Sequence, residues 1–495
     1  MSDSSGNWFG KLLKKVSQQD PGVAPIPTPE PERSNAAAWF EKGNSLHSLG
    51  RYDEAIHCYD KALELDPRFA MAWNNKGGSL ASLGRYAEAI RCYDRTLELD
   101  PRNALAWNNK GHSLNNLGRH EEAVRCYDKA LELDASIAAV WDNKGNTLDG
   151  MGRHEEAVRC YDEALVLDPR HAVIWYDKGI SLDSVGRNEE AIHCYDKALE
   201  LDPRHVPSWT NKGVSLLRIG RNEEAICCCD KALELDPRFA TAWYNKGNSL
   251  HSLGRHDEAI HCYDKALELD PRSAASWYNK GHSLHSLGRY EEAIHCYDKA
   301  LELDPSNAGA WTNKGNNLDR LGRYEEAIHC YDKALELDMR DVTAWSNKGA
   351  SLHSLGRYEE AIHCLDRALE LDPRYVNAWT NKGSSLGSLD RYEESILCHD
   401  KALELDPCHV AAWIGKGISL NNLGRYEESI LCYDRALELD PHDAATWFNK
   451  ALAEDVLNRW REAAHSYQQF LSLAPARQYA KQIEYTRKRL QELGG

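Results

Sequence analysis

Tryptophan recurs every 34 residues along most of this 495-residue chain. The series has no gap and no insertion, and it consists of Trp39, Trp73, Trp107, Trp141, Trp175, Trp209, Trp243, Trp277, Trp311, Trp345, Trp379, Trp413 and Trp447. A segment of this length cannot bury its own apolar face, so neighbouring segments must stack on one another. The spacing therefore predicts thirteen stacked repeats over residues 36–477, with each tryptophan at the fourth position of its repeat.

Each repeat is predicted to form two helices, as the second repeat illustrates. Apolar residues at helical spacing predict a first helix over residues 70–83. Gly84 follows, which is typical of the residue just after a helix. A second helix is predicted over residues 86–99, and Asp100-Pro101 ends it because proline disfavours helix at the residue before it.

Nine residues of the first repeat carry a known family pattern: Trp39, Gly43, Leu46, Gly50, Tyr52, Ala55, Tyr59, Ala62 and Pro67. The pattern resembles that of the tetratricopeptide repeat family over residues 36–477. The resemblance implies an all-α fold, a right-handed superhelical solenoid of thirteen helix-turn-helix repeats that binds proteins in the concave groove of its first helices. One position departs from the family, because lysine replaces the usual leucine from Lys42 to Lys450. Its long stem can cover apolar surface while its amine reaches a carboxylate.

The two ends of the chain differ from the repeats. Residues 1–20 are predicted to be a short amphipathic or disordered segment, and the proline-rich residues 21–35 a linker. Residues 8–16 place apolar side chains on one stripe beside three lysines. This stripe either tethers the chain to a partner or to an anionic membrane surface, or it is a frayed tail or a helix docked on the first repeat. Residues 478–495 are predicted to be a C-terminal capping helix.

Composition limits the classes of partner. The formal net charge of −17 argues against nucleic acid, whose phosphates need a basic surface. No apolar run approaches the ~20 residues of a membrane span, and the start of the chain does not read as a secretory signal. We therefore expect a cytoplasmic protein. Twelve of the 15 cysteines follow the 34-residue period from Cys58 to Cys432, as small apolar residues of the second helices in a reducing compartment would.

Catalytic motifs are not found in the sequence. It contains no phosphate-binding loop, dinucleotide glycine pattern, zinc-protease motif or nucleophile elbow, so we expect neither an enzyme nor a cofactor. One metal hypothesis arises, because His282 and His285 share a helix face and His251 holds the matching position one repeat earlier. Repeat duplication explains histidines in such an array equally simply, so we predict no metal site.

The predicted binding groove carries asparagine at the sixth position of ten repeats: Asn75, Asn109, Asn143, Asn211, Asn245, Asn279, Asn313, Asn347, Asn381 and Asn449. A carboxamide has a donor and an acceptor, which match the backbone of an extended peptide. The series resembles the asparagine ladder in the repeat superhelix of O-linked N-acetylglucosamine transferase, whose catalytic domain has no counterpart here. The other interpretation is that this asparagine is simply part of the repeat consensus.

Two stretches of the groove depart from this uniform track. Asp142, Asp149, Asp177 and Asp183 are predicted to form an acidic patch that favours basic partner segments. Tyr244 and Tyr278 offer adaptable contacts in repeats seven and eight. The predicted function is a non-enzymatic scaffold that binds extended peptides or partner segments in the groove. The alternative is a structural protein whose repeats associate end to end, and the sequence leaves the oligomeric state open.

Overall fold

The structure is a computed structural model that describes residues 31–493, and these residues form 27 α-helices and no strand. The chain divides into two compact units, residues 1–245 and 246–495. The helices of the first unit are α2 (Pro31–Ser48), α3 (Tyr52–Leu65), α4 (Ala70–Ser82), α5 (Tyr86–Leu99), α6 (Ala104–Asn116), α7 (His120–Leu133), α8 (Ala138–Gly150), α9 (His154–Leu167), α10 (Ala172–Ser184), α11 (Asn188–Leu201), α12 (Val206–Arg218) and α13 (Asn222–Leu235).

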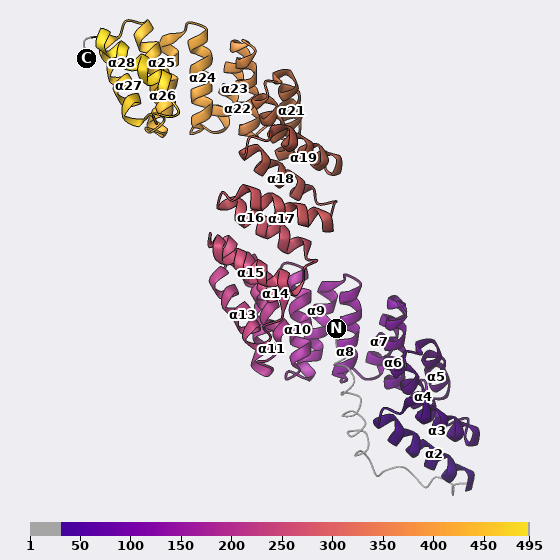
Figure 1. Ribbon diagram of the computed structural model, residues 1–495. Helices are drawn as coiled ribbons and strands as arrows, with labels where there is room; N and C mark the ends of the chain where they lie inside the picture. Colours follow the sequence, from indigo (N-terminus) through magenta and orange to yellow (C-terminus); the bar gives the residue numbers. More distant parts are fainter. Residues whose placement is uncertain (1–30, 494–495) are drawn as a thin grey trace. The chain divides into compact units, whose positions relative to one another are not determined.

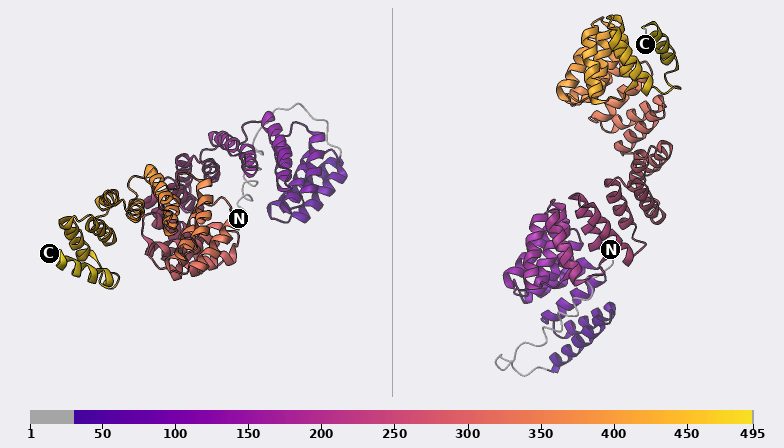
Figure 2. Two further views of the ribbon diagram at one scale, coloured as in Figure 1. Left: turned by 90° about the horizontal axis from the view of Figure 1, so that it is seen from above. Right: turned by 90° about the vertical axis from the view of Figure 1, so that its left-hand side faces the viewer.

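The second unit continues the same alternation, and α14 (Ala240–Ser252) spans the boundary. Its helices are α15 (His256–Leu269), α16 (Ala274–Ser286), α17 (Tyr290–Leu303), α18 (Ala308–Arg320), α19 (Tyr324–Leu337), α20 (Val342–Ser354), α21 (Tyr358–Leu371), α22 (Val376–Ser388), α23 (Tyr392–Leu405), α24 (Val410–Asn422), α25 (Tyr426–Leu439), α26 (Ala444–Val456), α27 (Trp460–Leu473) and α28 (Ala480–Glu492). Within each unit the two helices of a repeat pack together and contact the next repeat (Figures 1 and 2). The predicted all-α class of paired helices is confirmed.

A left-handed glycine ends the first helix of most repeats. In the second repeat Gly84 has a φ of 73°, and the amide of Arg85 donates to the carbonyl of Leu80 at 2.9 Å. This hydrogen bond closes the last turn of α4 and reverses the chain into α5. The predicted helix over residues 70–83 ends one residue earlier, at Ser82, and the second helix covers residues 86–99 as predicted.

A second glycine lets the two helices of a repeat approach closely. A Cβ atom on Gly77 would lie 2.6 Å from Cε1 of Tyr93, whose side chain is fully buried. Cys92 is buried beside it, and burial raises the pKa of its thiol to about 11, so the thiol stays protonated at neutral pH. All 15 cysteines lie in the described residues, and none of them is joined in a disulfide there.

Neighbouring repeats are joined by the residues that mark the period. The Trp107 indole nitrogen donates to the carbonyl of Pro101 at 3.2 Å, across the turn between repeats two and three. The Lys110 ammonium lies 2.6 Å from Asp94 of the preceding repeat and 5.3 Å from the centre of the Trp107 ring. The lysine that departs from the family pattern thus forms an ion pair between repeats, and its partner is an aspartate sixteen residues earlier.

The helices α2 and α28 lie at the two ends of the described residues. Residues 1–30, including the predicted amphipathic stripe of residues 8–16, lie outside the described residues. The helix α2 begins at Pro31, so the last five residues of the range predicted as a linker are helical, and proline is tolerated in a first helical turn. At the other end Leu490 of α28 and Leu493, which directly follows this helix, pack on repeat thirteen, and Arg489 pairs with Asp455 at 2.8 Å.

Candidate binding surface on the first helices

The residues predicted to bind ligand lie on the first helix of each repeat. When the first residue of a repeat, such as Ala70, is counted as position one, they occupy positions five, six and twelve. We call positions five, six, nine, twelve and thirteen the first-helix surface. The asparagines at position six are not freely exposed there, because Asn109 and Asn245 are buried and the other eight are half-buried.

The asparagine side chains donate to the preceding repeat. Their Nδ2 atoms reach an oxygen at position five or nine of that repeat, in the pairs Asn75–Asn44 (2.9 Å), Asn109–Asn74 (3.4 Å), Asn143–Asn108 (3.0 Å), Asn211–Tyr176 (3.3 Å), Asn279–Asn248 (2.9 Å), Asn313–Tyr278 (2.9 Å) and Asn347–Asn316 (2.6 Å). Half-buried amides need such partners. The asparagines therefore join repeats, which favours the consensus interpretation, and their contact with a ligand stays a prediction.

A second polar series, which sequence reasoning missed, joins positions twelve and ten. His47 Nδ1 lies 2.8 Å from Ser79 Oγ of the next repeat, and His353 Nδ1 lies 3.0 Å from Ser385 Oγ in the same way. The signal was present in the sequence, because serine recurs at position ten opposite a polar residue at position twelve of the preceding repeat. These bonds leave less of the polar surface free for a ligand than the sequence suggests.

Three of the four predicted acidic residues come together in repeats four and five. Asp142 accepts from Asn146 Nδ2 at 3.3 Å, and Asp149 lies 2.8 Å from His154 Nδ1 and bonds Ser181. Within residues 31–493 no lysine or arginine pairs with Asp142, Asp149 or Asp177. The cluster of these three carboxylates, which we call the acidic junction, has no lysine or arginine partner in the described residues, and Asp149 contacts the His154 imidazole.

Burial changes the protonation of the acidic junction. It raises the pKa of Asp142 to about 6. It raises the pKa of Asp177 to about 8, with a further contribution from the negative charges of Asp142 and Asp149. A carboxylate that is removed from water and set beside like charges binds its proton more tightly. Asp177 is thus largely protonated at neutral pH unless a cation approaches it.

The fourth predicted acidic residue belongs to the next junction. Asp183 accepts from Tyr195 Oη at 2.8 Å and from Ser215 Oγ at 2.7 Å, and it lies 3.8 Å from the Arg218 guanidinium. Its hydrogen-bonding capacity is used within the protein. The predicted acidic patch is therefore narrower in the structure than in the sequence.

The tyrosines predicted for repeats seven and eight are partly buried in the structure. Tyr278 accepts from Asn313 Nδ2, its ring centre lies 5.8 Å from that of Tyr297, and burial raises its pKa. Tyr244, at position five of repeat seven, is half-buried. Both tyrosines are half-buried, and their contact with a ligand stays a prediction.

The three histidines of the metal hypothesis do not converge. His251 has its ring centre 4.8 Å from that of His282 and 4.9 Å from that of His256. His285 instead directs Nδ1 to Asn317 of the next repeat, 3.0 Å away. Among the residues that the structure describes, no three histidine, cysteine, aspartate or glutamate side chains are arranged to hold a metal ion.

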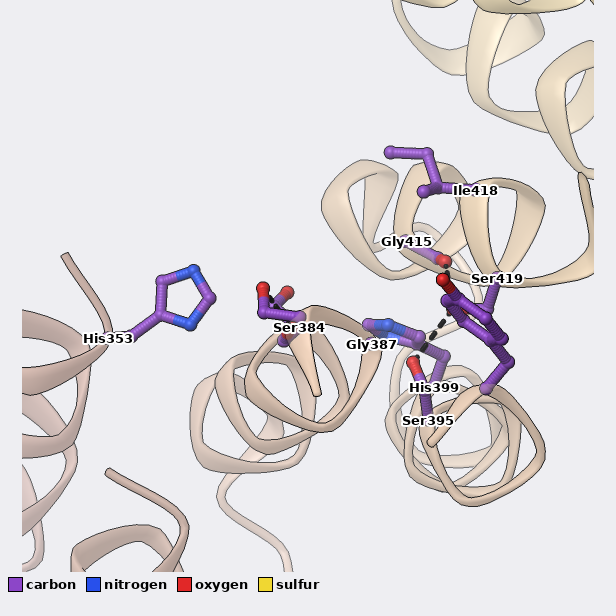
Figure 3. Close-up of a pocket in the computed structure, with 10 residues that line it drawn as sticks. His353, Ser384, Gly387, Ser395, His399, Gly415, Ile418 and Ser419 are labelled. Carbon is purple, nitrogen blue, oxygen red and sulfur yellow. Dashed lines mark hydrogen bonds between the residues drawn. The ribbon is translucent and has the colours of Figure 1, made fainter. Parts of the chain in front are cut away.

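A hollow of about 240 Å³ lies between repeats eleven and twelve (Figure 3). His399 lies in its wall with a fully buried side chain, and within the described part of the chain neither ring nitrogen has a hydrogen-bond partner. Burial lowers the pKa of this imidazole to about 4, so it is neutral at physiological pH. Sequence reasoning did not select this region, although His399 replaces the tyrosine of most repeats at its position.

Family models match individual repeats of this chain. Tetratricopeptide repeat models match residues 36–69, 70–103, 104–136, 138–171, 172–205, 376–408 and 410–443. The chain belongs to the tetratricopeptide repeat family. A model of the C-terminal domain of cilia and flagella-associated protein 70 also matches, over residues 206–381. This tetratricopeptide array is accordingly a protein-interaction scaffold. The search of curated proteins found no match to its sequence.

Several solved structures are similar to the tetratricopeptide array, and their TM-scores are low. Yeast Tom70 is 18% identical, with a TM-score of 0.40 over 86% of this chain and 96% of that chain. YrrB, described as a TPR protein with an unusual peptide-binding site, is 29% identical, with a TM-score of 0.34 over 37% of this chain and 95% of that chain. MamA is 28% identical, with a TM-score of 0.31 over 32% of this chain and 94% of that chain.

Within residues 31–493, no helix of the array has the length and apolar character needed to cross a membrane.

Proposed function

We propose that the array binds an extended segment of a partner protein along its first-helix surface, and that the acidic junction binds a lysine or arginine of that segment. The proposed role is binding without catalysis. The observation that carries it is the group of three partly buried carboxylates, Asp142, Asp149 and Asp177, none of which pairs with a lysine or arginine within residues 31–493. Structural carboxylates in this chain, such as Asp94, are paired with a lysine, so the acidic junction stands apart.

The physical reason is the cost of keeping these charges together. Ionising Asp177 next to Asp142 and Asp149 is unfavourable in the free protein, as its raised pKa records. A cationic side chain seated among them removes that repulsion and lets Asp177 ionise. Binding should therefore release a proton at neutral pH. A neutral side chain of similar length offers no such gain.

End-to-end association is the alternative function, and it has less support. At the C-terminal side α28 covers an apolar face of repeat thirteen through Leu490 and Leu493. A face that is covered in this way is not open for stacking on another copy. Light scattering over a concentration series tests the alternative, and growth of the particle mass with concentration would favour it.

The proposed function is tested with a blocked alanine-rich heptapeptide that has a central lysine, compared with the same peptide with norleucine. We expect the lysine peptide to bind at least about tenfold more tightly, since a charge-assisted contact contributes roughly 1.5–3 kcal/mol. Calorimetry in two buffers of different ionisation enthalpy should detect the released proton. Equal affinity of the two peptides would contradict the proposal.

A matched pair of variants locates the site. Asp177→Asn should abolish the preference for lysine, because it removes the central carboxylate. Asp319→Asn is the control, since Asp319 is bonded to Ser351 and lies in the second unit. If both variants lose the preference equally, the lysine is bound elsewhere.

A further inference from the structure

Repeats eleven and twelve differ from the other repeats at three positions that face one another. Position twenty-four is tyrosine in ten repeats, whereas repeat eleven has His399. Position six is Gly415 in repeat twelve, and position twelve is Gly387 in repeat eleven, and no other repeat has glycine at either position. All three changes reduce side-chain volume. They meet at one junction, which produces the hollow of about 240 Å³.

The regular junction between repeats nine and ten shows what is missing. There Tyr331 Oη donates to Asn316 Oδ1 at 2.9 Å, and Asn347 Nδ2 donates to the same oxygen at 2.6 Å. The phenol and the carboxamide of Asn347 together occupy the space between the two repeats.

At the junction of repeats eleven and twelve the corresponding residues are His399, Ser384 and Gly415. The carboxamide is therefore absent. A Cβ atom on Gly415 would overlap the His399 ring, so this junction cannot hold an asparagine of its own.

The hollow opens on the first-helix surface. Ser384 and Ile418 occupy position nine of their repeats, Gly387 occupies position twelve, and all three line the hollow together with His399 (Figure 3). Ile418 is 41% exposed, which marks the open side.

The polar groups of the hollow define the chemistry of its ligand. No lysine, arginine, aspartate or glutamate lines it. The neutral His399 imidazole has one N–H donor and one acceptor nitrogen. The Ser384 hydroxyl donates to the carbonyl of Thr380 at 3.1 Å, so its lone pairs remain to accept a hydrogen bond. A charged ligand would be buried here without a counter-ion, which is strongly unfavourable.

We propose that this hollow binds a primary carboxamide, the side chain of a glutamine in a partner segment. The carboxamide takes the place of the asparagine amide that repeat twelve lacks. Its carbonyl oxygen accepts from the His399 N–H, its amino group donates to Ser384 Oγ, and its methylenes lie along Ile418. The identity of the ligand as part of a partner segment rests on the proposed function, whereas binding of the carboxamide itself does not.

The test uses three small probes of the same length: propionamide, propionate and propylammonium. Saturation-transfer NMR with the full chain should show propionamide bound, with an apparent affinity at least about tenfold above that of either charged probe, because the charged probes leave buried groups unpaired. Equal signals from the three probes would show binding without selectivity, and no propionamide signal would show that the hollow does not bind the carboxamide. Either outcome would overturn the proposal.

Two variants locate the binding. His399→Tyr combined with Gly415→Asn restores the regular residues and should remove the propionamide signal. Gly387→Leu, which places the residue of repeat six (Leu217) at the mouth, should do the same without touching His399, and its Cβ has room at 3.4 Å from Ser395 Oγ. Circular dichroism identifies a variant that fails to fold, and Gly387→Leu then decides alone. Retention of the signal in a folded Gly387→Leu protein contradicts the proposal.

A separate control distinguishes a failure of the carboxamide proposal from a failure of the proposed function. Asp177→Asn should leave propionamide binding unchanged, because Asp177 lies in the first unit. Loss of the lysine-peptide preference with retained propionamide binding would refute only the acidic junction. Loss of propionamide binding with a retained lysine preference would refute only the carboxamide site.

Discussion

The acidic junction of repeats four and five and the hollow of repeats eleven and twelve depart from the repeat at the same place. Both replace the asparagine at position six, by Asp177 in one case and by Gly415 in the other. In the regular junctions this asparagine donates to the preceding repeat, as Asn347 does to Asn316. Asp177 places a carboxyl group where the amide donor of that bond would be, and Gly415 removes the side chain. Both proposed binding sites thus lie where the repeat lacks the asparagine at position six.

Restoring asparagine at the two places should have opposite effects, and the larger is expected at repeat twelve. Gly415→Asn forces its Cβ into the His399 ring, which is buried and enclosed also by Gly383. We expect it to destabilise this junction by about 3 kcal/mol, as overpacking of a core does. Hydrogen-exchange mass spectrometry of α23 and α24 measures the effect locally, because repeat arrays do not always unfold in one step. Unchanged protection of these helices would show that the ring can move aside.

Asp177→Asn should instead stabilise its junction at pH 8, because the amide carries no charge that has to be buried. The folded pKa of Asp177 is raised to about 8 from the ordinary value of 3.8. Stability from this group is therefore fully present below pH 4 and is lost as the pH rises to about 8. The difference in thermal midpoint between variant and wild type should grow from near zero at pH 4 to its largest value at pH 8. A difference independent of pH would mean that Asp177 has an ordinary pKa.

The regular junction between repeats nine and ten provides the reference with which the effects of Gly415→Asn and Asp177→Asn are compared. Asn347→Ala removes the donor to Asn316 and should destabilise the junction of repeats nine and ten by about 1 kcal/mol. Exchange protection of α18 and α20 should fall, while that of α24 stays unchanged. If the loss is negligible, the asparagine series does not join repeats, and its use for ligand gains support.

The smallest effect is expected for the ion pair between repeats. The Lys348 ammonium lies 2.5 Å from Asp332, whose side chain is 45% exposed. Because water screens a pair of this kind, Lys348→Met should destabilise by only about 0.5 kcal/mol. Denaturant midpoints at low and high salt provide the measurement, since the wild type should lose its small advantage at high salt. An effect that persists at high salt would point to the contact of the lysine with the Trp345 ring instead.

Local pattern in the sequence determined the helices, the period and the class of fold. The glycine at Gly84 and the proline at Pro101 act within a few residues of themselves, so the turn and the end of α5 follow from them directly. The predicted helix over residues 86–99 has the bounds seen in the structure. The family resemblance rested on the same local pattern, and the family models bear it out.

Only the tertiary structure decided what the polar residues contact. Asn75 donates to a residue 31 positions earlier and Asn143 to one 35 positions earlier, and the packing of two repeats selects between these partners. The protonation of Asp177 likewise depends on its burial beside Asp142 and Asp149. His399 and Gly415 are ordinary residues when each is considered alone. They form a hollow because consecutive repeats bring them together, and side-chain volume and hydrogen bonding between repeats are properties of that packing.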